Sequence, residues 1–148
     1  MVLAADWVSP SLARDRVHRW LRRLRWPPDD RDDVVHAVSE AVSNSVEHGY
    51  GVAPGAAALH PGTVRIEGWV VVDDAGGRAR HVELLVLDRG VWRPPAAGAD
   101  RPWGTALMRA LTAELVVHHG PDGTAVLLRG HPVSAHPVDG AGGGPAPG

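Results

Sequence analysis

The sequence predicts an α+β fold, a two-layer sandwich with a mixed, mostly antiparallel sheet and helices on one face. Three observations lead to this prediction. Helical spacing of apolar residues occurs in residues 11–25, 34–50 and 104–114, and strand-type patterns occur in residues 63–73, 81–87, 115–119 and 124–129. The strands follow one another in pairs joined by short turns, which favours antiparallel pairing with the helices segregated. At 148 residues, 44% of them hydrophobic, the chain is long enough for one domain with a core.

The N-terminal elements are expected to be a short edge strand within residues 1–10 and then a helix to about residue 25. Ser11 is expected to cap this helix. Its buried side is expected to consist of Leu12, Val17, Trp20, Leu21 and Leu24. Pro27 and Pro28 end the helix, and Asp29 or Asp30 is expected to cap the next one.

The exposed side of that first helix is rich in arginine, and two interpretations of it stay open. It is either a surface for a protein partner or nucleic acid, or a solvated polar face. The acidic stretch at residues 29–33 and the net charge of −2 argue against nucleic acid and against an anionic membrane.

The absence of cysteine, of lysine and of a membrane-spanning stretch excludes other classes of function. No cysteine is present, which excludes disulfides, thiolate nucleophiles and cysteine-held metals, and all 15 basic residues are arginine, which excludes mechanisms that need a lysine. No apolar stretch is long enough to span a bilayer, and no signal peptide is recognisable, so we expect a cytoplasmic protein without membrane contact.

The central segment, residues 34–50, is expected to form one amphipathic helix around which the rest is arranged. Glu40, Asn44 and His48 are spaced by four, so each lies about 40° further round the helix than the one before it, on a strip beside the apolar face. A carboxylate, an amide and an imidazole in a row can converge on an ion or a phosphate. The alternative is a solvated polar face.

The C-terminal half offers three further candidate positions. Asp88 is expected at the end of a hairpin strand, followed by Gly90, where a carboxylate can accept a hydrogen bond from a flat heterocycle. Gly104 opens a helix whose free amides favour phosphate, and Thr124 is expected beside Asp88 in the sheet. Each of these residues also has an ordinary structural role in turns, loops or strands. The domain is expected to cover residues 1–130, and residues 131–148, rich in Gly, Pro and Ala, are expected to be disordered.

The order of these motifs resembles a known ATP-binding module. Glu40-xxx-Asn44-xxx-His48-Gly49, Asp88-x-Gly90, the box that begins Gly104-Thr105, and Gly123-Thr124 follow one another over roughly residues 11–130. The series resembles the Bergerat-type fold of gyrase B, histidine kinases and MutL. Among these it is most similar to the small actinobacterial relatives of anti-sigma-factor serine/threonine kinases.

The resemblance implies ATP and Mg²⁺ as cofactors and assigns roles to the central strip. Glu40 matches the general base of the family and Asn44 its magnesium ligand. His48 matches the end of the same helix and is expected at the nucleotide. These roles suit the chemistry, because an amide oxygen is a hard ligand for Mg²⁺ and a carboxylate can accept the proton of an attacking hydroxyl.

The resemblance also assigns the base and the phosphates to residues of the second half. Asp88 matches the carboxylate that reads the adenine amino group, Gly90 the glycine beside the adenine, and Thr124 the threonine that joins Asp88 through water. Gly104 and Thr105 match the end of the phosphate-loop box and the position after it. Arg101 or Arg109 is expected to help neutralise phosphate charge.

Three residues depart from the family pattern and bear on the expected function. Trp92 replaces a second glycine of the first glycine box, and Pro102 and Trp103 stand before Gly104 where a glycine and commonly an arginine occur. Proline has no amide donor, so these departures bear on phosphate binding and catalysis more than on the fold. The resemblance therefore implies a serine/threonine kinase that phosphorylates an anti-sigma-factor antagonist and also binds a sigma factor. A homodimer is compatible with this expectation. The alternatives are an ATP-dependent switch without phosphoryl transfer and a partner-binding domain with a decayed pocket.

Overall fold

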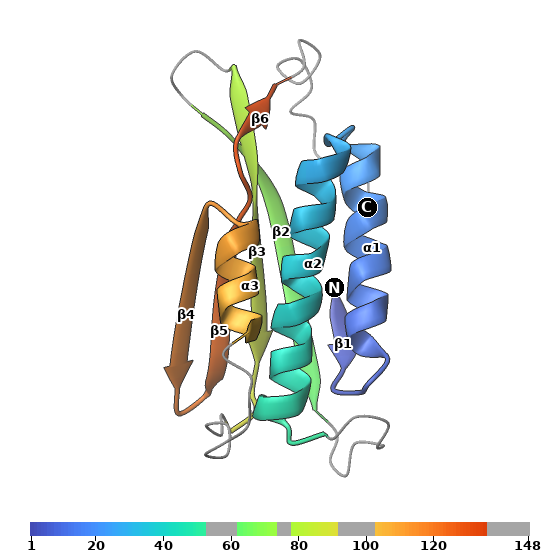
Figure 1. The fold of residues 1–148 in the computed structure, drawn as a ribbon. Coiled ribbons are helices and arrows are strands. Elements are labelled where there is room, and N and C mark those ends of the chain that lie inside the picture. The colour runs from blue at the N-terminus through green and yellow to red at the C-terminus, as the bar shows by residue number, and fades with distance from the viewer. Residues whose placement is uncertain (53–61, 74–77, 92–102, 136–148) are drawn as a thin grey trace, which may run out of the picture.

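The computed structural model describes residues 1–52, 62–73, 78–91 and 103–135, which form two layers (Figure 1). One layer is a six-stranded sheet with strand order β1-β2-β3-β5-β4, in which β6 also pairs with β3. Its strands are β1 (Val2–Ala4), β2 (Thr63–Val72), β3 (Ala79–Asp88), β4 (Glu114–Gly120), β5 (Gly123–Arg129) and β6 (Val133–Ser134). All strand pairs among the described residues are antiparallel.

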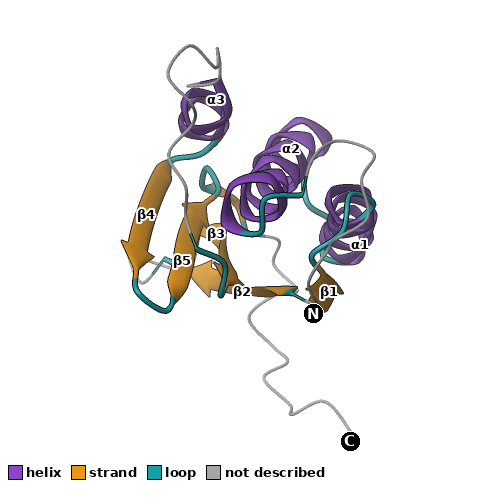
Figure 2. Ribbon diagram, turned by 90° about the horizontal axis from the view of Figure 1, so that it is seen from below, coloured by secondary structure: helices purple, strands orange, loops and turns teal. Residues whose placement is uncertain are grey.

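The second layer consists of α1 (Ser9–Arg23), α2 (Pro28–Asn44) and α3 (Trp103–Leu111). Figure 2 shows these helices on the same side of the sheet. The predicted two-layer α+β sandwich is therefore confirmed. None of the helices in the described ranges combines the length and the hydrophobicity needed to cross a membrane.

The core lies between α2 and the central strands. Val82, Leu84 and Val86 alternate along β3 and are at most 2% exposed, because every second side chain of a strand points to the same face. Val38 and Val42 of α2 are fully buried against this layer. Burying a side chain of this size contributes about 1.5–3 kcal/mol, so these valines help to hold α2 on the sheet.

Helix α1 begins two residues earlier than predicted. Ser9 starts the helix, its Oγ donates to the carbonyl of Ala4 at 2.6 Å, and Pro10 occupies the first turn. The prediction that Ser11 caps the helix is therefore wrong. Leu12 is also not part of the buried side, since it is 42% exposed and Ala13 is buried in its place.

The junction between α1 and α2 is a tight turn without a side-chain cap. Arg25 has a left-handed φ of 52°, and the amide of Trp26 donates to the carbonyl of Leu21 at 3.0 Å, as in a Schellman motif. Pro27 precedes α2, and no side chain caps the helix. Asp29 and Asp30 lie in its first turn, where a carboxylate favours the helix dipole, so the prediction that either one is the cap is wrong.

The end of α2 differs from the single helix predicted for residues 34–50. The α-helix already begins at Pro28 and ends at Asn44, and the chain continues as a π-helical turn, η1 (Ser45–Gly49). The amide of Tyr50 donates to the carbonyl of Ser45 at 3.1 Å, five residues back. Turns of this type occur often at functional sites.

Two other boundaries differ from prediction. Helix α3 ends at Leu111, because Glu114 already pairs with Arg129 at the start of β4. Val133, predicted to be in a disordered tail, is 7% exposed and pairs with Arg80 of β3. The expected disorder is therefore wrong at β6, and residues 136–148 lie outside the described ranges.

Candidate functional site

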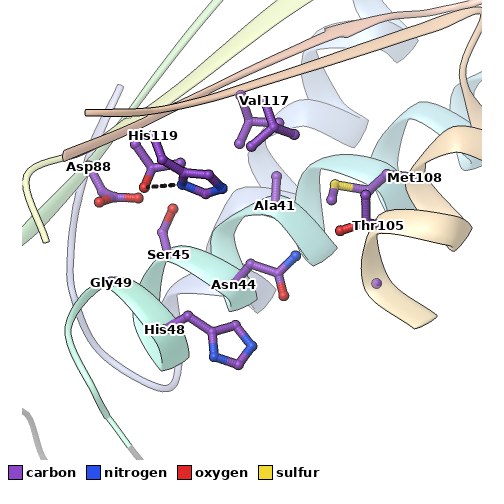
Figure 3. A pocket seen from close by; sticks show the side chains of 13 residues that line it. Ala41, Asn44, Ser45, His48, Gly49, Asp88, Thr105, Met108, Val117 and His119 are labelled. Atoms are coloured by element: carbon purple, nitrogen blue, oxygen red, sulfur yellow. Dashed lines mark hydrogen bonds between the residues drawn. The ribbon is translucent and has the colours of Figure 1, made fainter. Parts of the chain in front are cut away.

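A cavity of about 130 Å³ lies between the helices and the C-terminal end of β3 (Figure 3). The residues that line it come from α2 and η1, from α3, and from three neighbouring strands. They are Ala41, Asn44, Ser45, His48, Gly49, Asp88, Gly104, Thr105, Met108, Val117, His119, Thr124 and Val126. The cavity therefore brings together six of the seven predicted cofactor-binding residues, all except Gly90: Asn44, His48, Asp88, Gly104, Thr105 and Thr124.

One end of the cavity is built around the carboxylate of Asp88, which is 6% exposed. Its Oδ1 accepts a hydrogen bond from the amide of Gly90 at 2.9 Å. Thr124 stands directly opposite Asp88 in the pairing of β3 with β5, so the predicted placement of Thr124 beside Asp88 is confirmed. A buried carboxylate held by one amide keeps its remaining lone pairs for a ligand.

Two glycines allow the backbone around Asp88 to pack closely. A Cβ on Gly90 would overlap the carbonyl group of Gly49, and Gly123, with a φ of 126°, packs against the carbonyl oxygen of Asp88. Larger residues at either position would push these segments apart. Gly90 is not among the cavity-lining residues, so it acts here on Asp88 and Gly49.

The other end of the cavity is formed where α3 meets α2. A Cβ on Gly104 would overlap Oε1 of Glu40 and lie 3.3 Å from Nδ2 of Asn44. The first turn of α3, with its free amides and positive dipole end, therefore lies beside a carboxylate and an amide side chain. Asn44 and Thr105 line the cavity, whereas Glu40 lies next to it behind Gly104.

Comparison with known proteins identifies the family to which this fold and this cavity belong. The histidine kinase-like ATPase domain family matches residues 3–129. The chain belongs to this family.

Two solved structures are similar to this chain. The crystal structure of the RsbU and RsbW domains of Rv1364c from Mycobacterium tuberculosis is 28% identical, with a TM-score of 0.59 over 92% of this chain and 33% of that chain. The present chain thus spans about a third of that protein's structure. The histidine kinase domain of a blue-light activated histidine kinase from Erythrobacter litoralis EL346 is 20% identical, with a TM-score of 0.46 over 70% of this chain and 48% of that chain.

The central strip of the ATPase domain is only partly as predicted. Asn44 ends the α-helix and His48 lies in η1, so the two side chains are separated by the change from α to π geometry. Figure 3 shows His48 beside Asn44 and away from Asp88. Both residues border the cavity.

Ser45, Met108 and His119 are among the residues of the cavity wall that sequence reasoning missed. Ser45 is 5% exposed and lies in the π turn, and Met108 is 2% exposed and faces inward from α3. His119 Nδ1 lies 3.2 Å from Thr124 Oγ1. The alternation of Leu115, Val117 and His119 along β4 was the one available signal, since residues spaced by two share a face.

Several residues singled out in the sequence lie outside the described ranges or away from the cavity. Trp92, Arg101 and Pro102 lie outside the described residues, and Trp103 is described only as the first residue of α3. Arg109 is exposed on α3 and does not line the cavity. Within the described ranges, no group of three or more His, Cys, Asp or Glu side chains is arranged to hold a metal ion.

Proposed function

We propose that the chain binds ATP with Mg²⁺ in this cavity and acts as a regulatory serine/threonine kinase on an anti-sigma-factor antagonist, while also binding a sigma factor. One observation supports the proposal above the others. A single cavity joins a buried acceptor, Asp88, at one end to Asn44 and the first turn of α3 at the other. Family membership and the similarity to a structure with an RsbW domain support ATP and a regulatory role.

The base end of the site would select adenine. Asp88 accepts from the exocyclic amino group, and Thr124 stands beside it. Gly90 holds the carboxylate through its amide. The cavity of about 130 Å³ is smaller than the roughly 300–1,000 Å³ typical of small-molecule pockets, so it encloses part of the nucleotide and the rest extends from its mouth.

The phosphate end would be served by residues of α2, η1 and α3. Thr105 and the first amides of α3 face the phosphates, and His48 lies at the same end. The side-chain oxygen of Asn44 fits a magnesium site, because Mg²⁺ takes one or two protein oxygens and otherwise uses waters and phosphate oxygens. Bound there, the ion would neutralise phosphate charge.

Glu40 is the residue proposed to act on the attacking group. Its carboxylate would accept the proton of a serine or threonine hydroxyl of the partner as the hydroxyl oxygen bonds to the γ-phosphorus and ADP leaves. Glu40→Gln keeps the shape but removes the basic oxygen. ATP affinity is expected to stay within a few fold, and transfer of label from ATP to the antagonist to fall by roughly two to four orders of magnitude.

A second candidate function is an ATP-dependent switch without phosphoryl transfer. It is supported by the position of Glu40, which packs against Gly104 and does not line the cavity. Calorimetric titration with ATP, with and without magnesium, tests nucleotide binding, which both candidates share. Radiolabelled ATP with the purified protein and each candidate antagonist then separates them. Labelling that depends on Glu40 supports the kinase, whereas ATP-dependent partner affinity without labelling supports the switch.

A further inference from the structure

Three polar side chains form a row across the face of the sheet that looks toward the helices. Thr124 of β5 is the register partner of Asp88 on β3 and also of His119 on β4. All three line the cavity, and Figure 3 shows the ring of His119 close to Asp88. Nδ1 of His119 lies 3.2 Å from Oγ1 of Thr124.

The contact with His119 decides what the Thr124 hydroxyl offers to a ligand. A hydroxyl has one hydrogen and two lone pairs, and it rotates to suit its neighbours. If Nδ1 of His119 accepts a hydrogen bond from the Thr124 hydroxyl, the only hydrogen of that hydroxyl is used. Oγ1 can then only accept a hydrogen bond from a ligand in the cavity. If Nδ1 carries a hydrogen and donates, the hydroxyl hydrogen is free to point into the cavity.

When Nδ1–H of His119 donates to Thr124, the hydrogen-bonding groups of the cavity complement adenine but not guanine. Asp88 is an acceptor, so a donating Thr124 hydroxyl beside it creates an acceptor next to a donor. Adenine presents the complement, an amino group next to an unprotonated ring nitrogen, which the hydroxyl reaches directly or through a water. Guanine presents a carbonyl next to a ring N–H, which places acceptor against acceptor and donor against donor.

We propose that His119 donates from Nδ1–H to Thr124 Oγ1, turns the hydroxyl hydrogen into the cavity, and thereby helps the site to select adenine over guanine. This inference rests on the proposed function, because it requires a purine base in this cavity. His119 acts through Thr124 and is a positioning residue. An Nδ1–H exists in one neutral tautomer and in the imidazolium, so donation does not require a particular charge.

The test compares the affinities for ATP and GTP, with magnesium, in three variants. His119→Phe keeps a flat ring that suits a strand but removes Nδ1. It is expected to weaken ATP binding about three- to tenfold, the effect of one neutral hydrogen bond, and to lower the ATP-to-GTP affinity ratio. His119→Asn places an amide nitrogen at the position of Nδ1 and is expected to restore both values to within about twofold. His118→Phe is the matched control, since His118 is exposed, does not line the cavity and points to the other face; it is expected to change neither value.

A double variant tests whether His119 acts through Thr124. In a Thr124→Val background, adding His119→Phe is expected to have no further effect on either affinity, because the hydroxyl is absent. Circular dichroism checks the fold, and His119→Ala carries the same expectations if His119→Phe does not fold.

The outcomes separate this inference from the function on which it rests. An unchanged ATP-to-GTP ratio in His119→Phe, with normal binding by the parent protein, overturns the role of His119 alone. Additive losses in the double variant also overturn it. A parent protein that binds no nucleotide overturns both the inference and the proposed function.

Discussion

Replacing Asp88 by Asn is the sharpest test of how the cavity would read a base. The carboxylate is 6% exposed, and its Oδ1 already accepts from the amide of Gly90 at 2.9 Å. Asn keeps one acceptor oxygen, and the Gly90 amide requires it. The new NH₂ group must then take the place of Oδ2 and face the ligand as a donor.

The size of the effect follows from the hydrogen bond that is lost. A hydrogen bond to a charged acceptor contributes about 1.5–3 kcal/mol, so Asp88→Asn is expected to weaken ATP binding about 10- to 150-fold. GTP presents a carbonyl to the new NH₂ group, so its affinity is expected to rise or to stay unchanged. Stability is expected to change by less than about 1 kcal/mol, because the bond to Gly90 is retained.

Isothermal titration calorimetry with ATP and GTP measures both affinities, and urea unfolding measures the stability. The informative quantity is the ratio of the two affinities, since a general distortion of the cavity would weaken both nucleotides together. A parallel loss for ATP and GTP, or no loss for ATP, would refute the assignment of Asp88 to the adenine amino group.

Three further predictions concern the scaffold, and urea unfolding measures each of them. Arg25→Gly is expected to stabilise the fold by about 0.5–1 kcal/mol, because a left-handed φ of 52° is costly for a residue with a Cβ; Arg25→Ala, which keeps the Cβ, should give little change. Tyr50→Phe removes the hydroxyl that donates to Thr63 and accepts from the amide of Arg89, and it is expected to destabilise the fold by about 0.5–1.5 kcal/mol. Burial raises the pKa of Glu83, but the hydrogen bonds from Arg129 and Trp69 and the charge of Arg129 outweigh it, so the pKa lies below the usual 4.5. The carboxylate therefore stabilises the fold above that value, and Glu83→Gln is expected to cost about 1–2 kcal/mol at neutral pH and progressively less as the pH falls through the lowered pKa.

The helices and strands that could be predicted are those with a pattern of apolar residues that is visible within the element's own sequence. Alternation along residues 81–87 identified β3, because one face of that strand is buried and the other is not. The predicted end of this strand gave the position of Asp88 at the edge of the sheet, and the residue spacing along α2 gave the position of Asn44 beside the core. Both residues line the cavity. The roles given to these residues are predictions.

The features that were missed depend on contacts between distant parts of the chain. The spacing of apolar residues is the same before and after Asn44, so nothing local distinguishes the π turn from an α-helix. Val133 lies in a stretch whose Gly and Pro content suggested disorder, and its two-residue strand exists only because β3 extends past β5. His119 reaches the cavity only through the pairing of β4 with β5, and the sequence alone does not give that register.

The π turn at the end of α2 has a structural consequence for the whole cavity. It carries Gly49 against the carboxylate of Asp88, where an added Cβ would lie 3.1 Å from Oδ1, and the backbone of Gly49 meets Gly90. The hydroxyl of the next residue, Tyr50, bonds to Thr63 at the start of β2 and to Arg89 directly after β3. Asn44 and Asp88 stand at opposite ends of the cavity, and the helix of one is joined to the strand of the other at this turn. Because the backbones of Gly49 and Gly90 meet with no side chain between them, the π turn packs closely against the chain that follows β3.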